Sequence, residues 1–177
     1  MWRRVDGGVE HVRVATVGDG VEVDGVVALR GGGDGDGARR LRYLLRCDAA
    51  WSVRDVELHA TEDGASLSLH AEAAGRWRDA SPLLDGCVDV DLEAVVFTNT
   101  LPIRRLSLRV GESAVLDVAF VRLPSMSLVP VQQRYTRVAR DVYRYESLGS
   151  GFRADLRVDD DGLVVDYPGL ARRLWAA

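Results

Sequence analysis

Two aspartates, Asp89 and Asp91, stand two positions apart in a segment with a strand-like pattern. Residues two apart in a strand share a face, with Cα atoms about 6.5 to 7 Å apart. Carboxyl groups separated by about 5 to 9.5 Å act as acid and base in glycoside hydrolysis. The same acids could instead form a solvated face or pair with Arg104 and Arg105, which is the commoner outcome. This spacing alone does not name an enzyme.

A second polar group follows in the segment Thr98-Asn99-Thr100-Leu101-Pro102 and the arginines after it. The segment predicts a turn, because Asn and Thr side chains bond nearby backbone groups and proline fixes the direction of the chain. Asn99, Thr100, Arg104 and Arg105 offer amide, hydroxyl and guanidinium donors, which suit sugar hydroxyls or the oxygens of phosphates and carboxylates. A ligand site and an internal network fit these residues equally well.

The two arginines begin a segment, 103–110, for which we expect a strand. Neighbouring residues of a strand point to opposite faces. Arg104 shares its face with an apolar row, Leu106, Leu108 and Val110. We therefore expect Arg104 to be buried and paired, and Arg105 to be exposed.

Aromatic and polar residues alternate in two later segments. Gln133, Tyr135 and Arg137 share one strand face, and Tyr143 and Tyr145 share one in the next strand. Aromatic rings and polar donors on one wall would suit a ligand. Cross-strand pairing of the same side chains is the structural alternative.

Metal and cofactor chemistry find little support. His11, His59 and His70 have no second ligand at metal-binding spacing. The chain contains no lysine, which excludes a Schiff-base lysine and a Walker lysine. We expect no cofactor and no metal, and we expect the two cysteines, Cys47 and Cys87, to be reduced and buried.

Length and composition indicate one globular domain over residues 1–177. Apolar residues make up 47% of the chain and charged residues 28%, which is neither a disordered nor a membrane composition. No apolar run is long enough to span a bilayer and no export signal is recognisable, so we expect a cytoplasmic protein without a transmembrane segment. The net charge of −4 argues against nucleic acid as a partner. The oligomeric state is not indicated.

Period-two patterns recur along the chain and predict about a dozen strands, with a phase slip near Arg54-Asp55 that indicates a bulge. The fold class we predict is all-β: a single antiparallel sheet curled into a roll or barrel-like spiral around an interior. The glycine-rich stretch 31–37 predicts a surface loop, and only residues 170–176 suggest a short helix, at the C-terminus.

Five stretches together resemble the bacterial putative glycolipid-binding family, formerly a domain of unknown function. They are GCVDVDL, TNTLPIRRL, QRYTRV, YRYES followed by GF, and VDDDGLVVDYPGL, and the resemblance covers roughly residues 47–173. It implies a rolled, many-stranded antiparallel sheet and glycolipid binding, with no established catalytic residues. Val96 stands where relatives often have proline, and the 31–37 loop is similar to a local insertion.

Three functions remain open at this point. The first is non-enzymatic binding of a small amphipathic ligand, for example a glycolipid, with its tail in the interior and its head held by the segments 99–105 and 133–137. The second is a small hydrolase or lyase that uses Asp89, Asp91 or Glu146 with an arginine. The third is a protein-interaction module.

Overall fold

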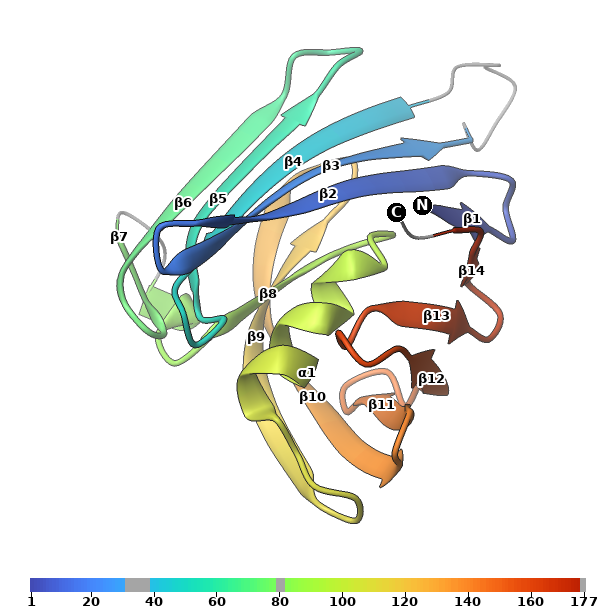
Figure 1. Cartoon of the computed structure of the whole chain (residues 1–177). Coiled ribbons are helices and arrows are strands. Elements are labelled where there is room, and N and C mark those ends of the chain that lie inside the picture. Colours follow the sequence, from blue (N-terminus) through green and yellow to red (C-terminus); the bar gives the residue numbers. More distant parts are fainter. Residues whose placement is uncertain (31–38, 79–81, 176–177) are drawn as a thin grey trace.

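The computed structural model describes residues 1–30, 39–78 and 82–175, which form one 14-stranded sheet with the order β7-β6-β5-β4-β3-β2-β1-β14-β13-β12-β11-β10-β9-β8 (Figure 1). The strands are β1 (Trp2–Arg4), β2 (Val9–Val17), β3 (Gly20–Leu29), β4 (Arg39–Cys47), β5 (Val53–Ala60), β6 (Ser66–Ala73), β7 (Arg76–Arg78), β8 (Asp89–Leu92), β9 (Ser113–Arg122), β10 (Ser127–Ala139), β11 (Val142–Ser147), β12 (Arg153–Val158), β13 (Val164–Tyr167) and β14 (Ala171–Arg173). The helical elements are η1 (Pro82–Leu84), η2 (Phe97–Asn99) and α1 (Thr100–Leu106). Neighbouring strands are antiparallel, except that β8 and β9 run parallel.

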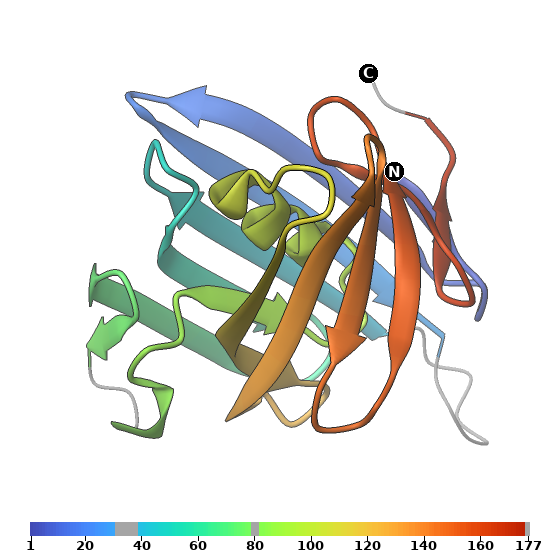
Figure 2. The same ribbon diagram turned by 90° about the horizontal axis from the view of Figure 1, so that it is seen from below.

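The sheet has two arms, β2 to β7 and β8 to β13, joined through the short strands β1 and β14. The helix α1 lies between the arms (Figures 1 and 2). The predicted single, mostly antiparallel sheet is confirmed, but the roll or barrel-like spiral is wrong, because the sheet is neither closed nor strongly curled. The helical segment occupies part of the space between the arms, and its Phe97 and Leu101 are fully buried.

Strand positions were predicted well wherever apolar residues alternate. Residues 9–17 and 20–29 form the expected hairpin, β2 and β3. The expected bulge is present at Arg54, because Arg46 pairs with Asp55 while the next residue, Cys47, pairs with Val53.

The helix α1 contradicts the predicted turn and strand over residues 98–110. The carboxylate of Glu10 on β2 accepts hydrogen bonds from the backbone N–H groups of Val96 (2.6 Å) and Phe97 (3.1 Å), where the helical segment begins. A carboxylate stabilises a helix start, because the first N–H groups lack partners within the helix. Burial raises the pKa of Glu10 above its ordinary value. Pro102 is tolerated because it lies in the first turn, where its missing N–H leaves no bond unmade.

The C-terminal helix predicted for residues 170–176 is also wrong, within the part of it that the structure describes. Ala171–Arg173 forms β14, which pairs with β1 at the other end of the chain. This pairing satisfies the backbone groups of both segments, and a contact so distant in sequence outweighs local preference. The 31–37 loop lies outside the described residues.

Both cysteines are free and buried, as predicted. Among the described residues, no helix is long and apolar enough to cross a membrane.

Candidate functional site

A network of polar side chains lies in the interior, between the helical segment and the β8 to β10 strands. Asp91 accepts hydrogen bonds from Thr98 Oγ1 (2.8 Å) and Gln133 Nε2 (2.7 Å). Asn99 Oδ1 accepts one from the hydroxyl of Tyr135 (2.9 Å). Burial raises the pKa of Asp91 to about 6, and the two hydrogen bonds oppose this shift. These groups satisfy one another and thereby fix the helix against the sheet.

The second aspartate of the spaced pair, Asp89, forms an ion pair with Arg105. Arg105 donates from Nε (3.1 Å) and Nη2 (2.5 Å) to the two carboxylate oxygens, and the side chain of Asp89 is only 1% exposed. The expectation that Arg104 is buried and Arg105 exposed is therefore wrong, because the segment is a helix and strand alternation does not apply. Glu146 lies 3.5 Å from Arg134.

Two further candidates are packed inside. The hydroxyl of Thr100 is buried without a hydrogen-bond partner among the described residues. The ring of Tyr145 lies 5.4 Å from that of Tyr135 and 6.4 Å from that of Tyr167. Burial raises the pKa of Tyr145, so this phenol stays neutral.

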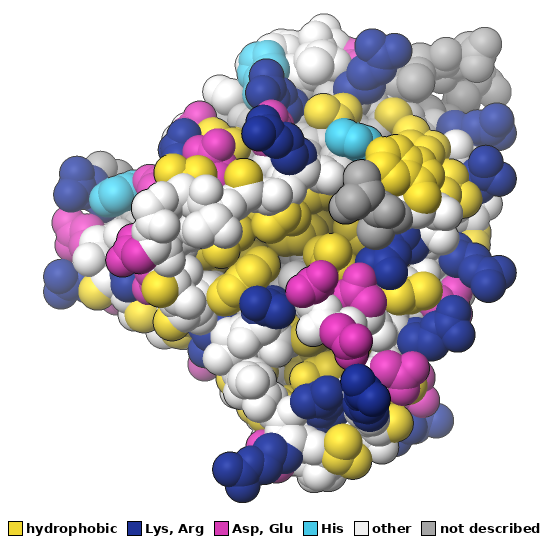
Figure 3. All heavy atoms as spheres, in the orientation of Figure 1, with side chains coloured by type: hydrophobic (Ala, Val, Ile, Leu, Met, Phe, Trp, Pro, Cys, Tyr) yellow, Lys and Arg dark blue, Asp and Glu magenta, His cyan; other side chains and the backbone are white. Residues whose placement is uncertain are grey.

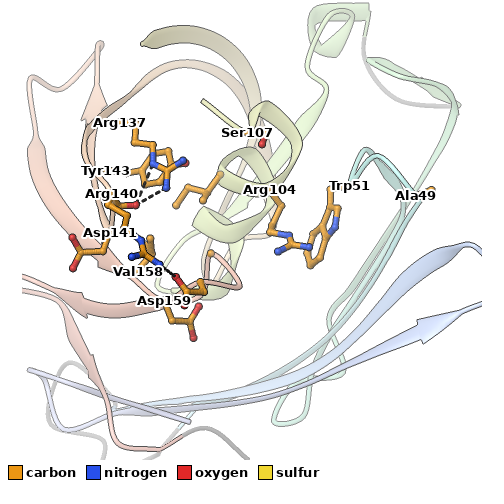
Figure 4. A pocket seen from close by; sticks show the side chains of 13 residues that line it. Ala49, Trp51, Arg104, Ser107, Arg137, Arg140, Asp141, Tyr143, Val158 and Asp159 are labelled. Atoms are coloured by element: carbon orange, nitrogen blue, oxygen red, sulfur yellow. Dashed lines mark hydrogen bonds and ion pairs between the residues drawn. The ribbon is translucent and has the colours of Figure 1, made fainter. Parts of the chain in front are cut away.

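A polar pocket of about 390 Å³ opens at the C-terminal end of α1 (Figure 4). It is lined by Ala49, Trp51, Ile103, Arg104, Ser107, Arg137, Arg140, Asp141, Tyr143, Val158, Asp159, Asp160 and Gly162.

On one side of the polar pocket, the guanidinium of Arg104 lies over the indole of Trp51, 4.9 Å from its centroid. Trp51 has a φ of 66°, a left-handed conformation that is unusual for a large residue. Arg104 Nη1 donates to the backbone oxygen of Asp161 (3.3 Å). Among the described residues, no carboxylate forms an ion pair with Arg104, which lines the pocket.

On the other side, the guanidinium of Arg137 lies over the ring of its cross-strand partner Tyr143, 5.4 Å from the centroid. Backbone carbonyls hold it: Nη1 donates to Leu108 O (2.9 Å), and Nε donates to Arg140 O (3.2 Å). Arg140 itself approaches Asp160 at 3.4 Å, and both side chains are exposed. Arg137 is thus held in place by hydrogen bonds from its guanidinium to backbone carbonyls, while the carboxylate of Asp160 at this pocket is exposed.

A second, apolar pocket of about 330 Å³ lies where the two arms of the sheet part. Strand β1 pairs only with Val9 and Glu10 of β2, so the rest of β2 has no described strand along this edge. The pocket is lined by Met1, Trp2, His11, Val12, Arg13, Val14, Leu163, Arg173 and Trp175. Figure 3 shows a hollow with hydrophobic walls between the arms, on the side where the chain termini lie in Figure 1.

The two pockets adjoin across the turn that links β12 to β13. Gly162 lines the polar pocket and its neighbour Leu163 lines the apolar one. Asp159 of the polar pocket forms an ion pair with Arg173 of the apolar one. A Cβ atom on Gly162 would lie 3.1 Å from Arg104 Cδ, so the absence of a side chain lets the turn pack closely on α1.

Of the predicted ligand-binding residues, three line the polar pocket: Arg104, Arg137 and Tyr143. Pairing of β10 with β11 brings the predicted aromatic and polar residues of these strands onto one face. The other predicted residues lie outside the pocket linings described above: Asp89, Asp91, Asn99, Thr100, Arg105, Gln133, Tyr135 and Tyr145.

Sequence reasoning missed Trp51 and every residue of the apolar pocket. The strain at Trp51 is a backbone property without a sequence pattern, and the apolar pocket depends on how short β1 is. One usable signal was the run Asp159-Asp160-Asp161-Gly162, which places acids and a permissive glycine in one turn.

Comparisons with known proteins agree with this fold. A family model described as putative glycolipid-binding matches residues 1–173. A crystal structure of a DUF1089 family protein from Pseudomonas aeruginosa is similar, with 36% sequence identity and a TM-score of 0.86 over 98% of this chain and 96% of that one. No curated protein matches the chain.

Proposed function

Because this chain belongs to the putative glycolipid-binding family, we propose that it binds a small amphipathic ligand across its two adjoining pockets. The tail would occupy the apolar pocket and the head the polar pocket, on either side of the turn at Gly162 and Leu163. The observation that carries this proposal is the adjacency of the two pockets, one polar and one largely apolar. Each has a volume within the usual range for small-molecule sites, about 300 to 1,000 Å³.

The polar pocket suits a sugar head in its chemistry. Sugar hydroxyls both donate and accept, so they need donors and acceptors together. Arg104 supplies donors without a competing carboxylate among the described residues, while Asp141 and Asp160 supply exposed acceptors. Of the residues singled out from the sequence, Arg104, Arg137 and Tyr143 are therefore those that we assign to the head.

The apolar pocket suits an alkyl tail. Its lining includes the apolar side chains of Trp2, Leu163, Val12 and Val14. Transfer of apolar surface from water is favourable by about 25 cal/mol per Å², which is about 0.8 kcal/mol for each buried CH₂ group. Affinity should therefore rise with the length of the tail until the pocket is full.

Calorimetric titration with octyl glucoside, below its micelle concentration, tests the proposal. We expect saturable binding that is much tighter than for glucose alone. Val14→Asp should abolish it by placing a charge on the tail, since Val14 lines the apolar pocket and is 42% exposed. The matched control is Val115→Asp on β9, at a valine that is 50% exposed and lines neither pocket. The proposal is wrong if octyl glucoside shows no saturable binding, or if both variants bind it equally.

A further inference from the structure

The outer face of the junction between β14, β1 and β2 carries a basic and apolar patch next to the apolar pocket. Strand register defines this face: Arg172 of β14 pairs with Arg3 of β1, and Arg3 pairs with Val9 of β2. The alternate residues, such as Trp2, point inward and are buried. His11 follows on the outer face of β2, opposite Val26 of β3.

The arginines of this face lack carboxylate ion pairs in the described part of the chain. Arg3, Arg13 and Arg172 are exposed, and among the described residues none forms an ion pair with a carboxylate. Like charges directly opposite one another, as Arg3 and Arg172 are, destabilise a sheet. The carboxylate opposite Arg13 in the sheet, that of Asp24, is already paired with Arg42. Asp166 lies opposite Arg172, but this single carboxylate does not balance the charges of Arg3, Arg13 and Arg172. A chain with a net charge of −4 thus concentrates positive charge here.

Large apolar side chains lie among these arginines. Trp175 is 49% exposed and its ring lies 6.3 Å from that of His11. Leu174, Val9 and Val26 are also exposed. Figure 3 shows basic side chains gathered along the edge beside a hydrophobic patch, at the upper right. Trp175 and His11 also line the apolar pocket, so the patch adjoins this pocket.

We propose that this face docks on an anionic lipid surface. A tryptophan has an apolar body with a polar N–H, which places it at the boundary between lipid tails and head groups. Arginines near an anionic surface contribute about 1 kcal/mol each, which corresponds to a factor of about five in affinity. Charge complementarity therefore favours a membrane over a neutral protein partner. Docking on this face places the apolar pocket beside the lipid, because His11 and Trp175 belong both to the patch and to the pocket lining. The inference does not depend on the proposed function, since docking requires only the outer face.

Sedimentation with lipid vesicles tests docking. The wild-type chain should sediment with vesicles of phosphatidylcholine and phosphatidylglycerol at low ionic strength, but not with phosphatidylcholine alone, and added salt should release it. The double variant Arg3→Glu/Arg172→Glu should lower partitioning by at least about tenfold. Trp175→Ser should lower it as well. The control, Arg109→Glu/Arg122→Glu, makes the same change in net charge at exposed arginines elsewhere and should lower partitioning much less.

Docking is refuted if the wild type does not sediment with anionic vesicles, or sediments equally with neutral ones. It is also refuted if the two double variants behave alike, or if Trp175→Ser changes nothing. Thermal unfolding checks that each variant is folded, and Trp175→Ser decides alone if Arg3→Glu/Arg172→Glu does not fold. Titration of the double variants with octyl glucoside separates docking from ligand binding, because Arg3 and Arg172 line neither pocket.

Discussion

Removal of Arg105 should strongly destabilise the fold. The carboxylate of Asp89 is 1% exposed and receives two hydrogen bonds from Arg105, whose own side chain is 18% exposed. Arg105→Ala leaves that carboxylate buried without its counter-charge, and breaking a buried pair in this way costs about 3 to 5 kcal/mol. For a chain of this length, such a loss lowers the midpoint of thermal unfolding by roughly 10 °C.

Urea denaturation of Arg105→Ala beside Arg104→Ala checks this expectation. Arg104 is exposed and forms no ion pair with a described carboxylate, so Arg104→Ala should cost less than about 1 kcal/mol. Adding Asp89→Asn to Arg105→Ala should recover part of the lost stability, because the buried charge is then gone. Equal small losses for the two arginine variants, or a larger loss at Arg104, would refute the burial of the Asp89 pair.

Three more predictions concern the interior. Thr100→Val should leave the free energy of unfolding unchanged or raise it, because it removes a hydroxyl that has no partner among the described residues. Thr98→Val should lower the free energy of unfolding by about 1 to 3 kcal/mol, because it breaks the hydrogen bond to Asp91. Equal losses of stability for the two variants in urea denaturation would contradict this. The pKa of Asp91 is raised from 3.8 to about 6, so its contribution is most favourable below pH 4 and stability falls by roughly 3 kcal/mol as the pH rises through 6. Asp91→Asn should flatten that part of the pH profile of unfolding, and an unchanged profile would exclude Asp91 as its source. Gly25→Ala should lower the thermal midpoint by several degrees, since a Cβ would lie 2.1 Å from Tyr43 Cζ, and an unchanged midpoint would mean that the ring moves freely.

Local patterns predicted most of the sheet, because each strand buries alternate residues against the same core. The hairpin of residues 9–29 illustrates this, since Val12 and Val14 alternate in one strand, Val21 and Val23 alternate in the other, and its turn contains glycine. The bulge at Arg54 was visible as a break in the alternation. Such features depend on residues close together in sequence.

The helix α1 could not be predicted from its own residues. Its start is stabilised by Glu10, which lies 86 residues from Val96 along the chain. The sequence around the helix therefore does not indicate that a carboxylate will bond its first N–H groups. The segment 103–110 also alternates as a short strand would. The candidate site was missed in part for the same reason. Arg104 remains a predicted ligand-binding residue, and its position over Trp51 arises from the helix and from a strained turn on the other arm.

Native mass spectrometry of the purified protein tests ligand binding most directly. If the adjoining pockets bind an amphipathic ligand, the protein taken from cell extract should carry a lipid mass that organic solvent removes. Val14→Asp should lose that mass, whereas Val115→Asp should keep it. A protein that shows only the mass of its own chain, both from extract and after incubation with octyl glucoside, would contradict the proposed function.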